Sequence, residues 1–158
     1  MDLRPVPIDH PDAVRLIAEV QAFYRERYGD EDATPVDTAE FAGPRGFFAV
    51  GYVDGAAAAC GGWRAREGGD DPELRDGDAE IKRMYVAAAH RRRGFARAVL
   101  AELERTAAAA GLLRTVLETG LLQPEAMALY ASAGYAPIPR FGAYRDSPDS
   151  RCFAKVLH

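Results

Sequence analysis

The residues best suited to chemistry form one run, Arg91-Arg92-Arg93-Gly94-Phe95-Ala96. An apolar segment at residues 81–86 precedes this run, and an alanine-rich helical pattern follows it. A turn between a strand and a helix presents unpaired backbone N–H groups at the positive end of the helix, which is a binding site for pyrophosphate. Gly94 lets the backbone approach the anion closely, and Ala96 keeps the next position small. Cations at a helix N-terminus are unfavourable unless an anion binds there, so the three arginines also favour a phosphate ligand.

The elements that must position this turn alternate along the chain. Two prolines confine the first strand to a sheet edge, and Asp54-Gly55 is a strong hairpin signal between the second and third strands. Strands are expected at residues 3–8, 46–53, 56–66, 79–86, 113–119, 135–138 and 152–157. Helices are expected after a cap at Asp9 or Asp12 up to Gly29, at residues 94–110 up to Gly111, and from Pro124 to Gly134. The acidic stretches 30–45 and 67–78 are expected to be mainly loops, the first with one short helix.

Together these elements predict one domain over residues 1–158 with an α+β fold, in which helices pack on both faces of a central sheet as a three-layer α/β arrangement. Hydrophobic residues make up 48% and charged residues 28% of the chain, which is typical of a globular protein. The net charge of −4 argues against nucleic acid and anionic membranes as partners. No segment approaches a membrane span and no secretory signal is present, so we expect a cytoplasmic protein with Cys60 and Cys152 reduced. The three histidines are scattered without metal-ligand spacing, and no metal is expected.

The turn and its neighbours resemble the GCN5-related N-acetyltransferase (GNAT) family. The family signature is Arg/Gln-x-x-Gly-x-Gly/Ala after a strand, and Arg91-x-x-Gly94-x-Ala96 matches it. Residues 80–86 resemble the family's fourth strand, and residues 126–135 resemble its last helix with the pattern A-x-x-x-Y-x-x-x-G-[FY]. The matches cover residues 77–157, while the first half agrees only in its layout. The resemblance implies a mixed, mostly antiparallel sheet of about seven strands and an enzyme that uses acetyl-CoA.

The resemblance also implies how acetyl-CoA is held. The turn would bind the pyrophosphate through the backbone of Arg91, Arg92, Arg93, Gly94, Phe95 and Ala96. The fourth and fifth strands diverge in this family, and the pantetheine arm lies between them. Backbone groups of Met84 and Val86 would bond that arm, and an N–H near Met84 or Tyr85 would polarise the thioester carbonyl. Gln123 stands where many members have an asparagine that touches the cofactor.

Acetyl transfer needs a base for the amine and an acid for the leaving thiolate. An amine with a pKa near 10.4 is almost wholly protonated at pH 7, so a carboxylate that removes the proton is useful. Glu80 precedes Gly94 by the same spacing as the glutamate base of the histone-acetylating branch, and Glu118 on the next strand is the second candidate. Tyr130 matches the family's general-acid tyrosine, because a phenol keeps its proton at pH 7.

These residues predict an acetyl-CoA-dependent N-acetyltransferase that acts by direct attack on a primary amine in a ternary complex. The first alternative is a non-catalytic module that binds and senses acyl-CoA, and the second is a toxin-like acetyltransferase of aminoacyl-tRNA. The acceptor, a small-molecule amine or a peptide, is not determined by any motif. The oligomeric state is also open, although a homodimer is common in such folds.

Overall fold

The computed structural model describes all residues from Met1 to His158. Its seven strands form one sheet in the order β1-β2-β3-β4-β5-β7-β6, in which only the β4–β5 pairing is parallel. The strands are β1 (Asp2–Pro5), β2 (Gly46–Val53), β3 (Ala56–Arg66), β4 (Asp78–Val86), β5 (Arg114–Gly120), β6 (Ala136–Ile138) and β7 (Ser150–Val156). The mixed, mostly antiparallel sheet of the expected fold is therefore confirmed.

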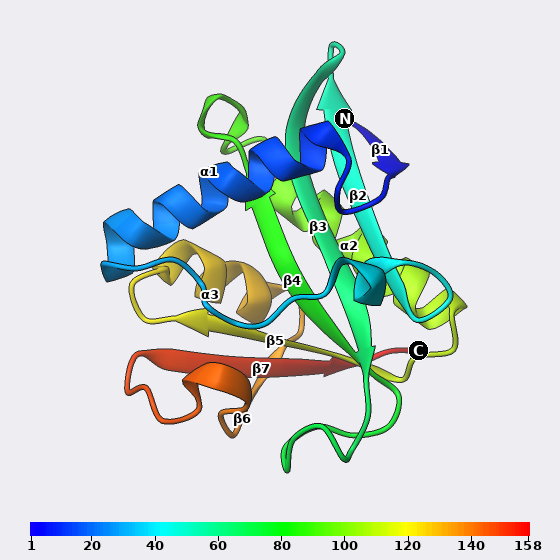
Figure 1. Cartoon of the computed structure of the whole chain (residues 1–158), viewed down its shortest axis with the longest axis vertical. Helices are drawn as coiled ribbons and strands as arrows, with labels where there is room; N and C mark the ends of the chain where they lie inside the picture. The colour runs from blue at the N-terminus through cyan, green and yellow to red at the C-terminus, as the bar shows by residue number, and fades with distance from the viewer.

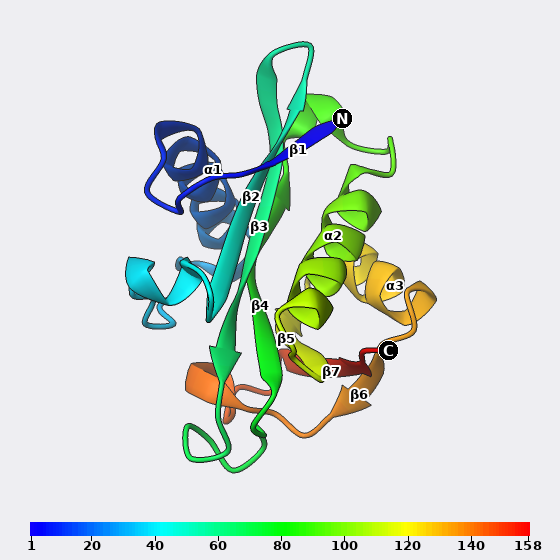
Figure 2. The same ribbon diagram turned by 90° about the vertical axis from the view of Figure 1, so that its right-hand side faces the viewer.

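Three α-helices cover the two faces of this sheet. Helix α1 (Pro11–Tyr28) lies on one face, and α2 (Phe95–Ala109) and α3 (Pro124–Ser132) lie on the other (Figure 2). Short 3-10 helices, η1 (Thr38–Phe41), η2 (Ala88–His90) and η3 (Gly142–Tyr144), lie in the connections. The three-layer arrangement is as expected. None of the helices combines the length and apolar character needed to cross a membrane.

Each face of the sheet has its own apolar core. On the α2 side, the buried Val99, Leu100, Leu103 and Ala107 pack in a cluster with Trp63, whose indole N–H donates to Thr106 Oγ1 over 2.9 Å. On the α1 side, buried residues of that helix pack in a second cluster of eight residues that includes Phe41, Phe48 and Val50. Ala79 and Ile81 of β4 and Leu117 of β5 also belong to the cluster on the α2 side, so the central strands hold both helix layers together.

Strands β4 and β5 are paired only at their beginnings. The parallel register joins Asp78, Ala79 and Glu80 to Arg114, Thr115 and Val116, and no β4–β5 pairing continues beyond those residues. The two strands then diverge like the arms of a V, as Figure 1 shows. Backbone groups on the inner edges of the V therefore have no strand partner.

Two local expectations differ from the structure. The first strand ends at Pro5 rather than at residue 8, since Pro5 and Pro7 have no backbone N–H to donate to a ladder. Helix α1 is capped by His10, whose Nδ1 accepts from the backbone N–H of Asp12 over 3.1 Å. Asp12 does not cap the helix, because its carboxylate accepts the hydroxyl of Tyr52 over 2.6 Å.

Candidate active site

A cavity of about 920 Å³ lies at the opening of the V between β4 and β5. Its walls come from the C-terminal half of α1, the loop after α1, the ends of β4 and β5, the start of α2, helix α3 and the segment from η3 to β7. Of the residues expected from the sequence, it is lined by Met84, Tyr85, Val86, Arg91, Arg92, Gly94, Phe95, Ala96, Glu118, Gln123 and Tyr130. Arg93 and Glu80 are the expected residues that do not line it.

The turn before α2 has a backbone suited to an anion. Arg92 and Gly94 both have positive φ angles, 64° and 77°, and such left-handed positions in a tight turn direct successive N–H groups into one concavity. None of the N–H groups from Arg91 to Arg97 donates to another group of the protein. A Cβ at Gly94 would meet nothing within 4 Å, so the surface above this glycine is open.

The side chain of Arg91 lies along the cavity wall rather than at the centre of the turn. Its Nε donates to the carbonyl oxygen of Val86 over 3.3 Å. Its guanidinium carbon lies 5.8 Å from the ring centre of Phe23 and 5.9 Å from that of Tyr85. Arg91 therefore connects the turn to α1 and β4 through cation–π contacts.

Tyr130 reaches the cavity from α3. Its ring is buried and packs against Tyr135 and Phe153, with ring centres 5.7 Å and 6.3 Å away. Burial, and to a smaller extent the charge of Glu118, raises the pKa of the Tyr130 phenol well above its ordinary value of 10. The phenol therefore stays protonated throughout the neutral range.

Glu118 lies on the diverging part of β5, where it faces the same cavity. Burial raises the pKa of this carboxyl to about 7, against the opposing effect of the positive charge on Lys82. The hydroxyl of Ser150 donates to Glu118 Oε1 over 3.3 Å. A carboxyl with a pKa near 7 exchanges a proton readily at neutral pH, which is the property required of a general base.

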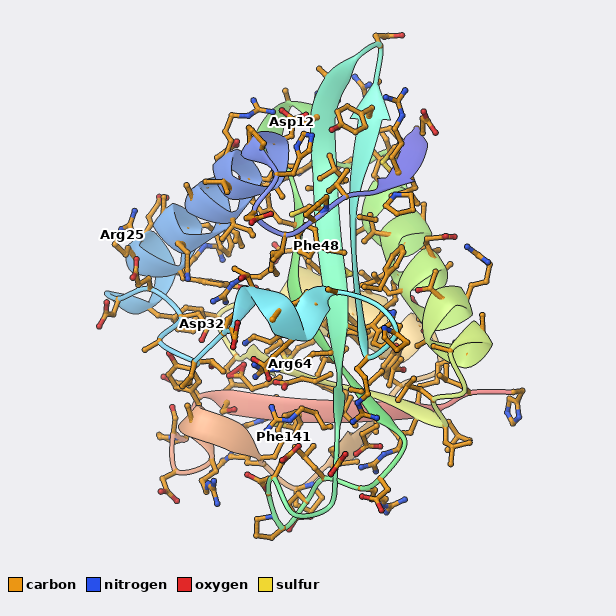
Figure 3. The ribbon with its side chains drawn as sticks, turned by 45° about the vertical axis from the view of Figure 1, so that its right-hand side comes forward. Asp12, Arg25, Asp32, Phe48, Arg64 and Phe141 are labelled. Carbon is orange, nitrogen blue, oxygen red and sulfur yellow. The ribbon has the colours of Figure 1, made fainter.

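Glu80 lies at the paired end of the V, outside the cavity. Its Oε1 accepts from Arg64 Nε over 2.9 Å and from Arg66 Nη1 over 2.6 Å, and the residue is 4% exposed. Arg64 also donates to Glu40 and to the carbonyl of Pro35, which places this network beneath η1 (Figure 3). The carboxylate of Glu80 thus orients Arg64, and Arg64 in turn ties the η1 segment to the sheet.

The cavity wall also contains a charged cluster, Asp32, Lys82 and Arg83, that the sequence patterns did not reveal. Asp32, on the loop after α1 (Figure 3), accepts from Lys82 Nζ over 2.8 Å and from Arg83 Nη1 over 2.6 Å. Tyr24 lines the same region, and its phenol pKa is raised mainly by burial. The adjacent cations Lys82 and Arg83 were the only sequence signal, and Asp32 lies 50 residues before Lys82 in the chain.

Gln123 is tied to α1. Its Nε2 donates to the hydroxyl of Tyr28 over 3.1 Å, and Arg27 Nη1 donates to the carbonyl of Leu122 over 2.8 Å. These bonds join the end of α1 to the β5–α3 connection. No group of three or more His, Cys, Asp or Glu side chains is arranged to hold a metal ion.

Comparison with known proteins agrees with this geometry. The model of the acetyltransferase (GNAT) family matches residues 13–135. An "IAA acetyltransferase" of Azospirillum brasilense is 33% identical over 144 residues, which are 91% of this chain and 90% of that protein.

Solved structures show the same architecture. The crystal structure of a "putative acyl-CoA N-acyltransferase" from Klebsiella pneumoniae superposes with a TM-score of 0.79 at 25% identity, covering 99% of this chain and 97% of that one. An aminoglycoside 6'-N-acetyltransferase complexed with coenzyme A superposes with a TM-score of 0.70 at 15% identity, covering 100% and 98%. The second likeness concerns the fold alone, and that neighbour holds coenzyme A.

Proposed function

The chain belongs to the acetyltransferase (GNAT) family, and from this premise we propose that it moves the acetyl group of acetyl-CoA to a primary amine by direct attack in a ternary complex. The observation that carries this proposal is that one cavity joins three features: a turn of unpaired N–H groups, the open edges of β4 and β5, and a facing pair of Tyr130 and Glu118.

Acetyl-CoA fits the residues present at the first two features. The turn from Arg91 to Ala96 supplies backbone donors and positive charge for the pyrophosphate. The pantetheine arm lies along the inner edge of β4, where backbone groups of Met84 and Val86 bond it. An N–H at Met84 or Tyr85 stabilises the oxyanion that forms on the thioester carbonyl, an interaction typically worth a few kcal/mol.

We assign the base to Glu118 rather than to Glu80. Glu118 faces the cavity with a pKa of about 7, whereas Glu80 is outside it and bonded to two guanidinium groups. The Glu118 carboxylate accepts a proton from the ammonium form of the acceptor. The neutral nitrogen then attacks the thioester carbon to form a tetrahedral intermediate.

Tyr130 assists departure of the thiolate. As the intermediate collapses, the C–S bond breaks and the phenol donates its proton to the sulfur. The second proton of the attacking nitrogen restores the phenol, so the products are the N-acetylated amine, CoA thiol and one proton on Glu118 that passes to water. The raised pKa of Tyr130 keeps the phenol protonated until this step.

A covalent acetyl-cysteine route has little support. Cys60 and Cys152 are both buried and neither lines the cavity. Burial raises the pKa of Cys60 to about 12 and that of Cys152 to about 11, so neither is a thiolate at neutral pH.

Initial-rate kinetics with acetyl-CoA and a panel of amines, followed by release of the free thiol, tests the proposal. A ternary complex predicts intersecting double-reciprocal lines, whereas an acetyl-enzyme predicts parallel lines. Binding of acetyl-CoA without thiol release for any amine would favour the sensing module instead.

A further inference from the structure

A bulge in β4 brings two cations to one face of the strand. Successive residues of a regular strand point to opposite faces, yet Lys82 and Arg83 both reach Oδ2 of Asp32. The β3–β4 register shifts between Cys60 and Gly62, and Arg83 has a φ angle of 59°, which side-chain-bearing residues seldom adopt. Bulges commonly redirect a side chain beside an active site. Here the bulge directs Arg83 to the same cavity as Lys82.

The cluster of Lys82, Arg83 and Asp32 holds two positive charges and one negative charge, so it carries one net positive charge. The side chains of Lys82 and Arg83 are 9% and 7% exposed, and the single carboxylate between them is 14% exposed. The other oxygen of Asp32 accepts the backbone N–H of Thr34. Glu118 is the remaining sheltered carboxyl of the cavity, because the acidic residues at the rim are exposed, namely Asp30, Glu31, Glu125 and Asp149.

The summed charge of this cluster and Glu118 changes when Glu118 acts as the base. With Glu118 ionised, the two cations and two carboxylates cancel. Once Glu118 has taken the proton of the acceptor, the cluster carries one net positive charge in a poorly solvated site. An unpaired buried charge is costly, so a ligand that supplies one negative charge is favoured at that moment.

We propose that the acceptor is an amino carboxylate, that is, an amine with a carboxylate close to it. This inference rests on the proposed function and names the substrate class for the same site. The ligand carboxylate binds Lys82 Nζ and the guanidinium of Arg83, both of which keep donors beyond those given to Asp32. Its amine then lies toward Glu118. A zwitterion keeps the site neutral before and after proton transfer, whereas a plain monoamine leaves one positive charge throughout.

Matched pairs of acceptors test this assignment. The common amino acids and their α-amides should be compared as acceptors, with kcat/KM obtained from thiol release at pH 8. A charge-assisted contact predicts that an accepted amino acid is favoured over its amide by roughly 10- to 100-fold. The amide carries the less basic amine, so its larger neutral fraction acts against this preference.

The outcomes distinguish a wrong substrate class from a wrong activity. Equal rates for acids and amides, or faster acetylation of amides or plain amines, would overturn the carboxylate assignment and leave acetyl transfer intact. Acetyl-CoA binding with no acetylation of any amine would overturn the proposed function itself.

Two charge variants test the cluster directly. Lys82→Gln removes one cation and should lower the acid-to-amide ratio of kcat/KM, whereas Asp32→Asn removes the competing carboxylate and should raise it. A general loss of stability would change both rates together and leave the ratio constant. Lys155→Gln is the matched control, because Lys155 pairs with Glu104 outside the cavity. A ratio that stays at the parental value in both cluster variants contradicts the inference.

Discussion

Arg114 and Asp78 form a two-bond ion pair at the closed end of the V between β4 and β5. Nε of Arg114 donates to Oδ1 of Asp78 and Nη2 donates to Oδ2, each over 2.8 Å. The two residues are also register partners in the short parallel ladder, and their side chains are 9% and 1% exposed. The pair therefore fastens the two strands directly before they diverge to form the cavity.

Arg114→Met should lower the free energy of unfolding by about 3–5 kcal/mol, because it leaves the carboxylate of Asp78 buried without its partner. Urea denaturation followed by circular dichroism measures the change. Arg45→Met is the control, since its pair with Glu67 is well exposed and should contribute less than about 1 kcal/mol. Equal effects of the two substitutions would contradict the fastening role.

Gly94→Glu should abolish acetyl-CoA binding, because a carboxylate would lie where the pyrophosphate binds. Gly111→Glu is a closely matched control: Gly111 also has a positive φ, 88°, with nothing within 4 Å of an added Cβ, but it lies at the other end of α2. Both variants should carry similar backbone strain, and only the first should lose affinity in calorimetry. Unchanged affinity in a folded Gly94→Glu protein would refute the pyrophosphate site.

Glu118→Gln should remove the base from the reaction. The parental rate should rise with pH through about 7 as Glu118 ionises, and then level off. The variant should lack this inflection and gain rate only as the amine loses its own proton. Its rate should therefore be about 10²- to 10⁴-fold below the parental rate near pH 8, and the difference should be smaller at pH 10.

Glu80→Gln separates the two candidate bases. It disturbs the pairs with Arg64 and Arg66, so it should lower stability while the inflection near pH 7 remains. The reverse result, an inflection lost only in Glu80→Gln, would return the base role to Glu80.

Glu118 should also make stability depend on pH. Its pKa is raised from 4.5 in the unfolded chain to about 7 in the folded protein, so the folded state binds the proton more tightly and loses relative stability as pH rises from 4.5 to 7. Glu118→Gln should therefore be more stable than the parent at pH 8, by about 3 kcal/mol at most, and similar to it at pH 4. Urea titrations at the two pH values measure this difference, and an equal effect at both would argue against the raised pKa.

Tyr130→Phe should lower kcat by about 100-fold with little change in acetyl-CoA affinity. The expected loss is at the lower end for general acid catalysis, because a thiol with a pKa near 8.5 is a fair leaving group without assistance. Tyr135→Phe is the control: it removes a hydroxyl bonded to Thr115 and Glu104 outside the cavity, so it should lower stability by about 1–2 kcal/mol and leave turnover unchanged. Parental turnover by Tyr130→Phe, with chemistry shown to be rate-limiting, would make Tyr130 a core aromatic only.

The parts that could be predicted from the sequence are those whose signals are local. The alternation of strands with helices, the glycines that end α1 and α2, and the turn at Gly94 all depend on residues within a few positions of one another. Two motifs were enough to identify the family, namely the turn Arg91-x-x-Gly94-x-Ala96 and the pattern at residues 126–135 on α3. Each is defined by the spacing of residues close together in the chain.

Local sequence patterns could not choose between Glu80 and Glu118 as the proposed base. Glu80 and Glu118 lie on adjacent strands, and the sequence favoured Glu80 by its spacing from Gly94. Arginines on β3 surround the carboxylate of Glu80, whereas Glu118 lies past the last paired residues of β5 and faces the cavity. Which carboxylate meets the substrate depends on where β4 and β5 separate.

By itself the sequence determined the fold class, the family and the strand-to-helix turn at Gly94, because short-range periodicity and turn chemistry encode them. Only the tertiary structure decided which charged side chains meet in the cavity. Asp32 meets Lys82 and Arg83 because α1 ends over β4 and a bulge rotates Arg83 toward the same face. Those contacts join residues about 50 positions apart, and no local pattern specifies a long-range pairing or the burial that raises the pKa of Glu118.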